Sequence, residues 1–455
     1  MMKRVLGNGL IVTMNQNREV FYGSVLIKDE VIERVIKHDP FENLKDLKNG
    51  IGEFDELIDC TGQLILPGLI QTHTHLTQTL FKGLGDDLQL MDWLQTKIWP
   101  SEAAHTAETN YISSKVGIGE LLKGGTTTIV NMESVNHTES SFEALKEMGI
   151  RAISGKCMMD YNEGVPKGLI ESLEVSLSES ERLLKKWHQT HNGLIEYALA
   201  PRFVVSCSDE LLKASVKMSR TYGVRLHTHA SENKGEIAIV RRRTGMENID
   251  YLKRIGFLGK HVILAHCIHL NDLEVQHLID SETVIAHCPS SNMKLASGFA
   301  PVHAMLQRGA KVTLGADGSP CNNELNIFME MRMAALIHKG NQLDSTIMNA
   351  KSVFEMATIK AAEALGKESE IGSVVEGKHA DLITLRIDKL ESMMVPLNAE
   401  NVYAQIVYNA SSRDVCHTLV NGALLVTHGQ LVNVSEADLY LDAKKAIINF
   451  IKDPK

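Results

Sequence analysis

The hydrophobic pattern divides the chain into a central region and two flanking regions of similar texture. Over residues 1–66, short apolar runs alternate with turn and charged residues, as in 25–36. This pattern predicts hairpin β-structure. The same texture returns at 371–385 and at 418–426, where Asn421-Gly422 is typical of a tight turn. The sequence therefore predicts two small β-rich pieces that flank a different central unit.

In the central region, brief apolar strands alternate with longer helical segments. Eight strand candidates are present, and they are 64–70, 126–131, 151–155, 195–200, 224–226, 262–265, 283–286 and 311–315. Such alternation predicts a parallel sheet, because parallel strands need helical crossovers. Eight repeats favour an α/β fold of the (β/α)8 barrel type, whose usual size is about 250 residues. A doubly wound open sheet is the alternative, but no glycine-rich nucleotide-binding motif follows any strand.

Composition narrows the function classes. The 455 residues carry 47 basic and 56 acidic side chains, and the net charge of −9 offers no general attraction for nucleic acid or anionic membranes. The seven cysteines form no CxxC pair, which favours reduced thiols in a cytoplasmic protein. No signal peptide is evident, and no apolar stretch approaches the roughly 18 residues of a membrane helix. We therefore expect a cytoplasmic protein without nucleic-acid or membrane partners.

Metal-binding side chains follow the predicted strands at their C-terminal ends, where a barrel of this type carries its active site. His73 and His75 follow the first strand, His229 the fifth and Asp317 the eighth. In an extended strand, the period of two places the His73 and His75 imidazoles on one face. Three imidazoles and a carboxylate suit catalytic zinc, which uses an open coordination position to hold and acidify a water molecule.

Two further residues are candidates for proton transfer. Glu232 lies three residues after His229, from where its carboxylate could take a proton from the water and hand it to a leaving nitrogen. His266, after the sixth strand, is a candidate acid/base or second-metal ligand. The fourth strand ends in Ala200-Pro201-Arg202 and offers no lysine to bridge two ions. A single ion is therefore predicted, and a binuclear amide-ring hydrolase is disfavoured.

Several motifs in fixed order resemble the amidohydrolase superfamily, and more narrowly its metal-dependent aminohydrolases. They are residues 67–75, 314–318 and 376–382, which together span most of the chain. The resemblance implies a barrel over 67–368 and a small β-sandwich domain formed by both chain ends, 1–66 and 369–455, the second with a terminal helix. It also implies a catalytic centre with one zinc or iron ion. The ligands would be His73, His75, His229 and Asp317, with Glu232 and His266 as acid/base residues.

Other segments resemble the deaminases of adenine nucleosides that act on 5′-deoxyadenosine, methylthioadenosine or S-adenosylhomocysteine. These segments are 91–94, 98–102, 291–298 and 321–326. The resemblance implies that Glu102 holds the ribose hydroxyls, and a carboxylate is suited to accept hydrogen bonds from a vicinal diol. Gln78 and Arg202 instead look like guanine deaminase, in which these positions hold the purine. Trp99 is a candidate for the wall of a nucleoside pocket or for a buried packing residue.

The predicted reaction is hydrolytic deamination of a 6-aminopurine nucleoside to the inosine-type product and ammonia. A guanine deaminase or a triazine hydrolase with the same mononuclear site is the alternative for the substrate. A non-catalytic barrel is the alternative for the function class, and His227 and His287, taken singly, are better interpreted as hydrogen-bonded interior histidines. The expected partners are the small-molecule purine and further copies of the chain in a homo-oligomer. The insert 86–99 is a candidate lid.

Overall fold

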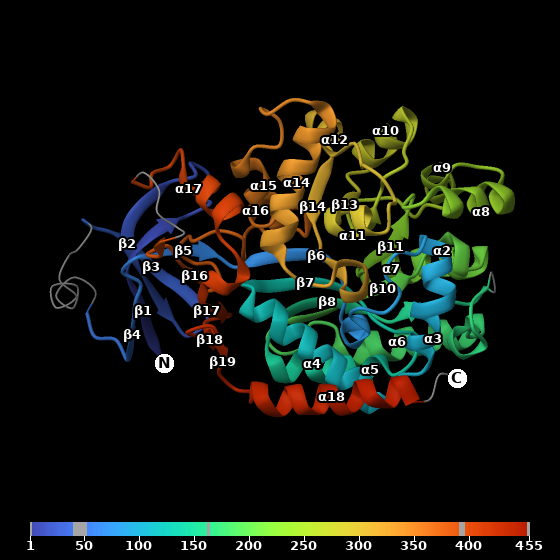
Figure 1. Ribbon diagram of the computed structural model, residues 1–455, viewed down its shortest axis with the longest axis horizontal. Helices are drawn as coiled ribbons and strands as arrows, with labels where there is room; N and C mark the ends of the chain where they lie inside the picture. Colours follow the sequence, from blue (N-terminus) through green and yellow to red (C-terminus); the bar gives the residue numbers. More distant parts are fainter. Residues whose placement is uncertain (1, 40–51, 162–163, 391–395, 453–455) are drawn as a thin grey trace.

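Two β-sheets organise the computed structural model, which describes residues 2–39, 52–161, 164–390 and 396–452. The first sheet has the strand order β19-β18-β17-β16-β5-β1-β2-β3, with β4 paired to β1. Its strands are β1 (Lys3–Val12), β2 (Val20–Lys28), β3 (Val31–Lys37), β4 (Glu56–Asp59), β5 (Gln63–Pro67), β16 (Leu382–Arg386), β17 (Val415–Val420), β18 (Ala423–Thr427) and β19 (Gln430–Leu431). Antiparallel pairing of β16 with β5 joins the two chain ends in one small β-unit, at the left of Figure 1.

The second sheet is parallel and forms the predicted (β/α)8 barrel. Its strands follow one another in chain order, and β9 (Cys157–Met158) pairs with β10 beside this path. They are β6 (Leu69–His75), β7 (Thr126–Met132), β8 (Arg151–Gly155), β10 (Ile195–Pro201), β11 (Arg225–Ala230), β12 (Val262–His266), β13 (Val284–His287), β14 (Lys311–Leu314) and β15 (Asp317–Gly318). The short strand β15 pairs with β6, with Asp317 opposite Thr74 and Gly318 opposite His75. This pairing joins the last strand to the first.

The prediction of one strand over 64–70 is wrong. Residues Gln63–Pro67 form β5 of the small sheet, whereas Leu69–His75 form β6 of the barrel. The chain passes between the two sheets at Gly68, whose N–H donates to the Asp381 carbonyl at 2.8 Å. A Cβ at Gly68 would lie 2.1 Å from Thr127 Oγ1, so only glycine fits at this crossing. The residues on both sides of Gly68, 64–67 and 69–70, are apolar, and the hydrophobic pattern therefore does not reveal the break.

Most helices surround the barrel, and the short helix α17 (Val402–Ala404) lies toward the small β-unit (Figure 1). The other helices are α2 (Leu90–Trp93), α3 (Trp99–Ala103), α4 (Ala107–Lys123), α5 (Thr138–Met148), α6 (Leu173–Trp187), α7 (Asp209–Tyr222), α8 (Lys234–Thr244), α9 (Asn248–Arg254), α10 (Asp272–Asp280), α11 (Pro289–Lys294), α12 (Val302–Gln307), α13 (Ser319–Asn322), α14 (Ile327–Gln342), α15 (Ala350–Met356), α16 (Ile359–Ala364) and α18 (Glu436–Lys452). Shorter 3₁₀ and π turns are η1 (Leu76–Phe81), η2 (Leu94–Ile98), η3 (Lys167–Leu169), η4 (Val204–Ser206), η6 (Gln405–Asn409) and η7 (Ser412–Asp414). The terminal helix α18 packs Ala443 and Ala446 with Phe81.

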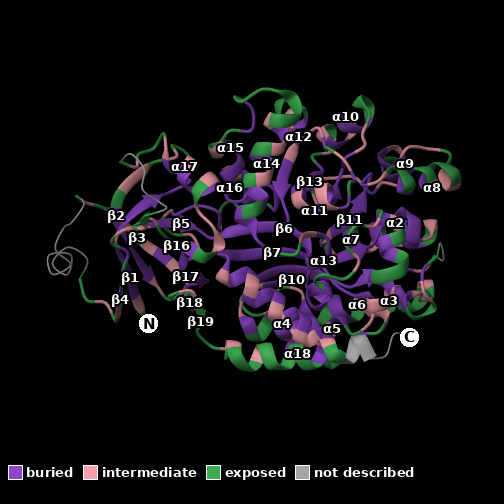
Figure 2. Cartoon of the chain, in the orientation of Figure 1, coloured by how far each residue is buried: buried purple, intermediate pink, exposed green. Residues whose placement is uncertain are grey.

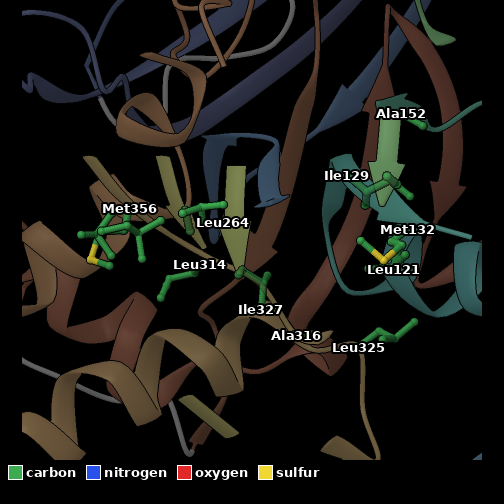
Figure 3. Close-up of a cluster of buried hydrophobic side chains, with 14 of the residues drawn as sticks. Leu121, Ile129, Met132, Ala152, Leu264, Leu314, Ala316, Leu325, Ile327 and Met356 are labelled. Atoms are coloured by element: carbon green, nitrogen blue, oxygen red, sulfur yellow. The ribbon is translucent and has the colours of Figure 1, made fainter. Parts of the chain in front are cut away.

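The hydrophobic core lies between the barrel strands and these helices. Every residue of β7 is buried, and the exposed residues lie mainly on the outer helices and connecting loops (Figure 2). Ile129 and Met132 of β7 lie beside Leu121 of α4, and Leu314 of β14 lies near Met356 of α15 (Figure 3). Close packing of this kind fixes the strands, and with them the side chains at their C-terminal ends.

Two further findings concern the cysteines and the helices. All seven cysteines are buried and carry free thiols, so none is in a disulfide. Within the described ranges, no helix combines the length and the apolar character that crossing a membrane requires.

Candidate metal centre and active site

Four side chains meet at the C-terminal end of the barrel. His73 and His75 come from β6, His229 from β11 and Asp317 from β15. All four are buried, and their ligand atoms lie within 4.8 Å of one another. Residues separated by more than 240 positions in the sequence thus form one group that can hold a metal ion.

The ring orientations of two of these histidines are set by backbone carbonyls. His75 Nδ1 donates to the Met132 carbonyl at 2.9 Å, and His229 Nδ1 donates to the Arg202 carbonyl at 2.8 Å. Because a carbonyl only accepts, each Nδ1 carries the proton and each Nε2 presents a lone pair. The two Nε2 atoms lie 3.2 Å apart. Such outer hydrogen bonds fix the tautomer that a metal ligand needs.

The carboxylate of Asp317 completes the group. Its Oδ1 lies 3.2 Å from His73 Nε2 and 3.3 Å from His75 Nε2, and its Oδ2 accepts from Ser291 Oγ at 2.7 Å. Burial opposes ionisation of Asp317, but the hydrogen bond with His73 and the positive charge of His266 hold the pKa of Asp317 well below the ordinary value. Burial lowers the pKa of His75 to about 3. An ionised carboxylate beside neutral imidazoles is the protonation state in which these groups bind a metal.

Backbone strain accumulates at the same end of the barrel. Ser231, His266 and Asp317 have φ angles of +55°, +73° and +64°, in the left-handed region that non-glycine residues rarely occupy. Each such residue costs about 1–3 kcal/mol and persists only where its surroundings over-determine it. Gly315, just before β15, approaches His73 so closely that a Cβ would lie 2.7 Å from the His73 carbonyl oxygen. Tight packing therefore holds the ligand-bearing turns in place.

Glu232 and His266 lie beside the ligand group without belonging to it. His266 Nε2 is 3.6 Å from Glu232 Oε2 and 3.8 Å from Asp317 Oδ2, and His266 Nδ1 donates to Asn292 Oδ1 at 3.0 Å. Burial raises the pKa of Glu232 to about 7. Burial lowers the pKa of His266, but the charges of Glu232 and Asp317 outweigh this and raise it overall. The arrangement places a carboxyl group suited to proton exchange near neutral pH next to the ligand group.

A cavity of about 360 Å³, counting its open mouth, lies in front of these residues. It is lined by His75, Gln78, Leu90, Trp93, Leu94, Arg202, Phe203, His229, Glu232, His266, Leu295 and Asp317. Three of the apolar lining residues come from the insert 86–99, which therefore forms part of the wall. The insert is tied to α11 by an ion pair between Asp86 and Lys294 at 2.6 Å. Its role as a lid stays a prediction.

Glu102 is held behind this wall in a buried network. Its Oε2 accepts from Arg202 Nη1 at 2.7 Å, and its Oε1 accepts from Arg202 Nη2 at 3.3 Å and from Gln78 Nε2 at 2.8 Å. Burial opposes the charge of Arg202, but the Glu102 carboxylate outweighs it and raises the pKa of Arg202. Trp99 is completely buried and lies outside the cavity lining, whereas Trp93 belongs to it. Gln78 and Arg202 thus reach the cavity directly, and Glu102 supports them from behind.

Comparison with known proteins identifies the family. The model of the amidohydrolase family matches residues 64–425. The chain belongs to the amidohydrolase family. It is 36% identical over 416 residues to the 5′-deoxyadenosine deaminase of Methanothermobacter thermautotrophicus, covering 91% of each chain. It is 32% identical over 447 residues to the 5-methylthioadenosine/S-adenosylhomocysteine deaminase of Bacillus cytotoxicus, covering 98% of each. The crystal structure of an adenosine deaminase from Xanthomonas campestris with bound zinc matches with a TM-score of 0.90 and 27% identity over 99% of each chain.

Several residues of this amidohydrolase site were not singled out from the sequence. Ser291 and Asn292, at the start of α11, bind Asp317 and His266. They fall in a segment that resembled the nucleoside deaminases, and that segment was the available signal. His227 fits the interpretation as a hydrogen-bonded interior histidine. It is completely buried, and its Nε2 lies 2.9 Å from Nδ1 of His73, so it orients one side chain of the ligand group.

Proposed function

We propose that this amidohydrolase is a zinc-dependent deaminase that hydrolyses the exocyclic C–N bond of an adenine nucleoside. The observation that carries the proposal is the convergence of the four ligand side chains with Glu232 and His266 on one cavity. The relatives named for 5′-deoxyadenosine and for methylthioadenosine and S-adenosylhomocysteine support the substrate class. Three imidazoles and one carboxylate suit zinc, and the Xanthomonas neighbour holds zinc.

In the proposed mechanism, an ion held by these ligands supplies Lewis-acid activation of the attacking water. Glu232 accepts a proton from that water while the water oxygen bonds to the purine carbon that carries the amino group. The attack moves the electron pair of the ring C=N bond onto the ring nitrogen. Glu232 then delivers the proton to the amino nitrogen, and the exocyclic C–N bond breaks with its electron pair on that nitrogen, so that ammonia leaves. The pair on the ring nitrogen re-forms the ring C=N bond, and the resulting 6-hydroxypurine tautomerises to the inosine-type product. His266, oriented by Asn292 at 3.0 Å, contacts the oxygen on which charge develops.

Glu102 is proposed to bind the ribose diol of a nucleoside. Both of its carboxylate oxygens accept from Arg202 and Gln78 in the present structure. Nucleoside binding therefore requires Glu102 to exchange part of this bonding for the ribose hydroxyls. The apolar wall that includes Trp93 and Leu295 packs on the base, and Trp99 supports that wall from within the core.

The same network favours a second candidate, a guanine-type free base. Arg202 lines the cavity and is kept in place by Glu102, so it can donate hydrogen bonds to a purine carbonyl oxygen. A free base also leaves the Glu102–Arg202 pair intact. In this case Gln78 and Arg202 hold the purine, and Glu102 is a supporting residue.

Ammonia release from a panel of compounds tests the proposal. The metal-loaded protein is incubated with 5′-deoxyadenosine, methylthioadenosine, S-adenosylhomocysteine, adenosine and guanine. Turnover of one or more nucleosides is expected. Turnover of guanine without turnover of any nucleoside would establish the second candidate. A chlorotriazine is tested separately, and chloride release from it, without turnover of guanine or of a nucleoside, would indicate a triazine hydrolase.

We also propose that the chain acts as a homo-oligomer in the cytoplasm. Seven buried free thiols are compatible with a reducing compartment. Analytical ultracentrifugation tests the assembly, and a monomer at micromolar concentration would contradict it.

A further inference from the structure

Glu236, in the first turn of α8, is a completely buried carboxylate that binds the segment carrying Glu232. Its Oε2 accepts from the backbone N–H of Glu232 at 2.7 Å and of Asn233 at 3.3 Å. Its Oε1 accepts from the backbone N–H of Ser231 at 3.1 Å and from Asn248 Nδ2 at 2.7 Å. Four donors thus converge on one carboxylate, and three of them are consecutive backbone amides.

The carbonyl side of residues 231–233 is hydrogen-bonded as well. The Ser231 carbonyl accepts from the N–H groups of Ile268 and His269, both at 3.0 Å, in the loop that follows β12. Ser231 itself has a φ of +55°, a conformation that costs free energy for a residue with a Cβ. The turn between β11 and α8 therefore depends on hydrogen bonds on both sides to keep this conformation, and Glu236 supplies those on the N–H side.

We propose that Glu236 is a positioning residue for Glu232. By fixing the backbone at residues 231–233, it holds the Glu232 carboxylate at the cavity, where Oε2 lies 3.6 Å from His266 Nε2. The inference rests on the proposed function, because it assumes that Glu232 moves the proton. A displacement of about 1 Å in such a group can lower the rate about 100-fold, so the backbone anchor is expected to affect catalysis directly.

Glu274 is a second buried glutamate that caps a helix, and it lies away from the proposed catalytic residues. Glu274 occupies the same position of α10 and is also buried, at 2% exposure. It accepts from the backbone N–H of Asn271 at 3.0 Å and of Ile249 at 3.1 Å. Both glutamates complete a capping box at the third residue of a helix. Only Glu236 also binds the segment of a proposed catalytic residue, so Glu274 is a matched control.

The test compares Glu236→Gln with Glu274→Gln in the metal-loaded protein. A glutamine turns an N–H₂ group toward donors that need an acceptor, so both variants lose stability. For Glu236→Gln we expect kcat to fall about 10- to 100-fold with KM changed less than about threefold, and Glu274→Gln is expected to retain kcat within about twofold. Amide hydrogen exchange at residues 231–233 should become faster in Glu236→Gln and stay unchanged in Glu274→Gln. Metal content should stay at the wild-type level in both.

The possible outcomes separate this inference from the proposed function. Wild-type kcat in Glu236→Gln, or an equal loss in both variants, would overturn the positioning role. If the wild-type protein deaminates none of the compounds, the proposed function fails, but exchange at 231–233 still tests the anchor, and unchanged exchange would overturn it. If Glu236→Gln does not fold, Asn248→Ala removes only the outer donor to Glu236. It is expected to raise exchange and lower kcat in the same direction by a smaller factor, and wild-type values for both would overturn the inference.

Discussion

Removing one member of the buried Arg202–Glu102 pair should destabilise the protein far more than removing both. The side chains are 5% and 1% exposed. Arg202→Met removes the two guanidinium hydrogen bonds of the Glu102 carboxylate and leaves the hydrogen bond from Gln78. Glu102→Leu leaves the positive charge of the Arg202 guanidinium without the carboxylate that balances it. Each single change is expected to lower the free energy of unfolding by about 3–5 kcal/mol. The double variant removes both charges and leaves the Gln78 amide unsatisfied, which costs about 1–3 kcal/mol.

The two single losses sum to about 6–10 kcal/mol, so the coupling free energy is expected to be at least about 3 kcal/mol. Urea unfolding of the metal-loaded variants measures it, provided that the slope stays constant across the cycle. The exposed pair Lys311–Glu282, with side chains 37% and 57% exposed, is the control and should give a coupling below about 1 kcal/mol. If the losses from the Arg202 and Glu102 variants simply add, the reasoning from burial is refuted.

Three other predictions follow from the site and its packing. Chelation of the metal should abolish ammonia release and lower the urea midpoint, and zinc should restore both; activity that survives complete removal would contradict the metal centre. Glu232→Gln should lower kcat by about 10²- to 10⁴-fold with metal content unchanged, and a wild-type kcat would exclude Glu232 as the proton carrier. Gly315→Ala should lower the free energy of unfolding by about 1–3 kcal/mol, because a Cβ meets the His73 carbonyl oxygen at 2.7 Å. An unchanged urea midpoint would show that the backbone can relax at this position.

The ligand group was predictable because two periodicities agree. Alternation along a strand places His73 and His75 on one face, and the β/α repeat brings the ends of all parallel strands to one rim. His229 and Asp317 then meet them without any knowledge of the loops, and the structure places the ligand atoms within 4.8 Å of one another. The same rule brought Glu232 and His266 to this rim, since Glu232 lies two residues after β11 and His266 is the last residue of β12; their roles in proton transfer stay predictions.

Side-chain pairing across long stretches of sequence was not predictable in the same way. The bonds of Glu102 to Arg202 join residues 100 positions apart, and no local pattern marks them. Trp93 lines the cavity but Trp99 does not, because two residues six positions apart in a helical stretch point in different directions, and the sequence does not show which of them faces the cavity. The break at Gly68 between two buried strands depends on contacts with Thr127, which hydropathy does not report.

Arg202 contacts a proposed metal ligand through its backbone and the substrate cavity through its side chain. Its backbone carbonyl accepts from Nδ1 of His229 at 2.8 Å, from the His229 N–H at 3.0 Å and from Thr228 Oγ1 at 3.1 Å. Its side chain lines the cavity and pairs with Glu102. Since every residue type provides the carbonyl, a substitution at this position can change the polar groups that face the substrate while the orientation of His229 is kept. A barrel built in this way can retain one hydrolytic centre while its substrate changes, which is why the substrate must be argued from the cavity and not from the fold.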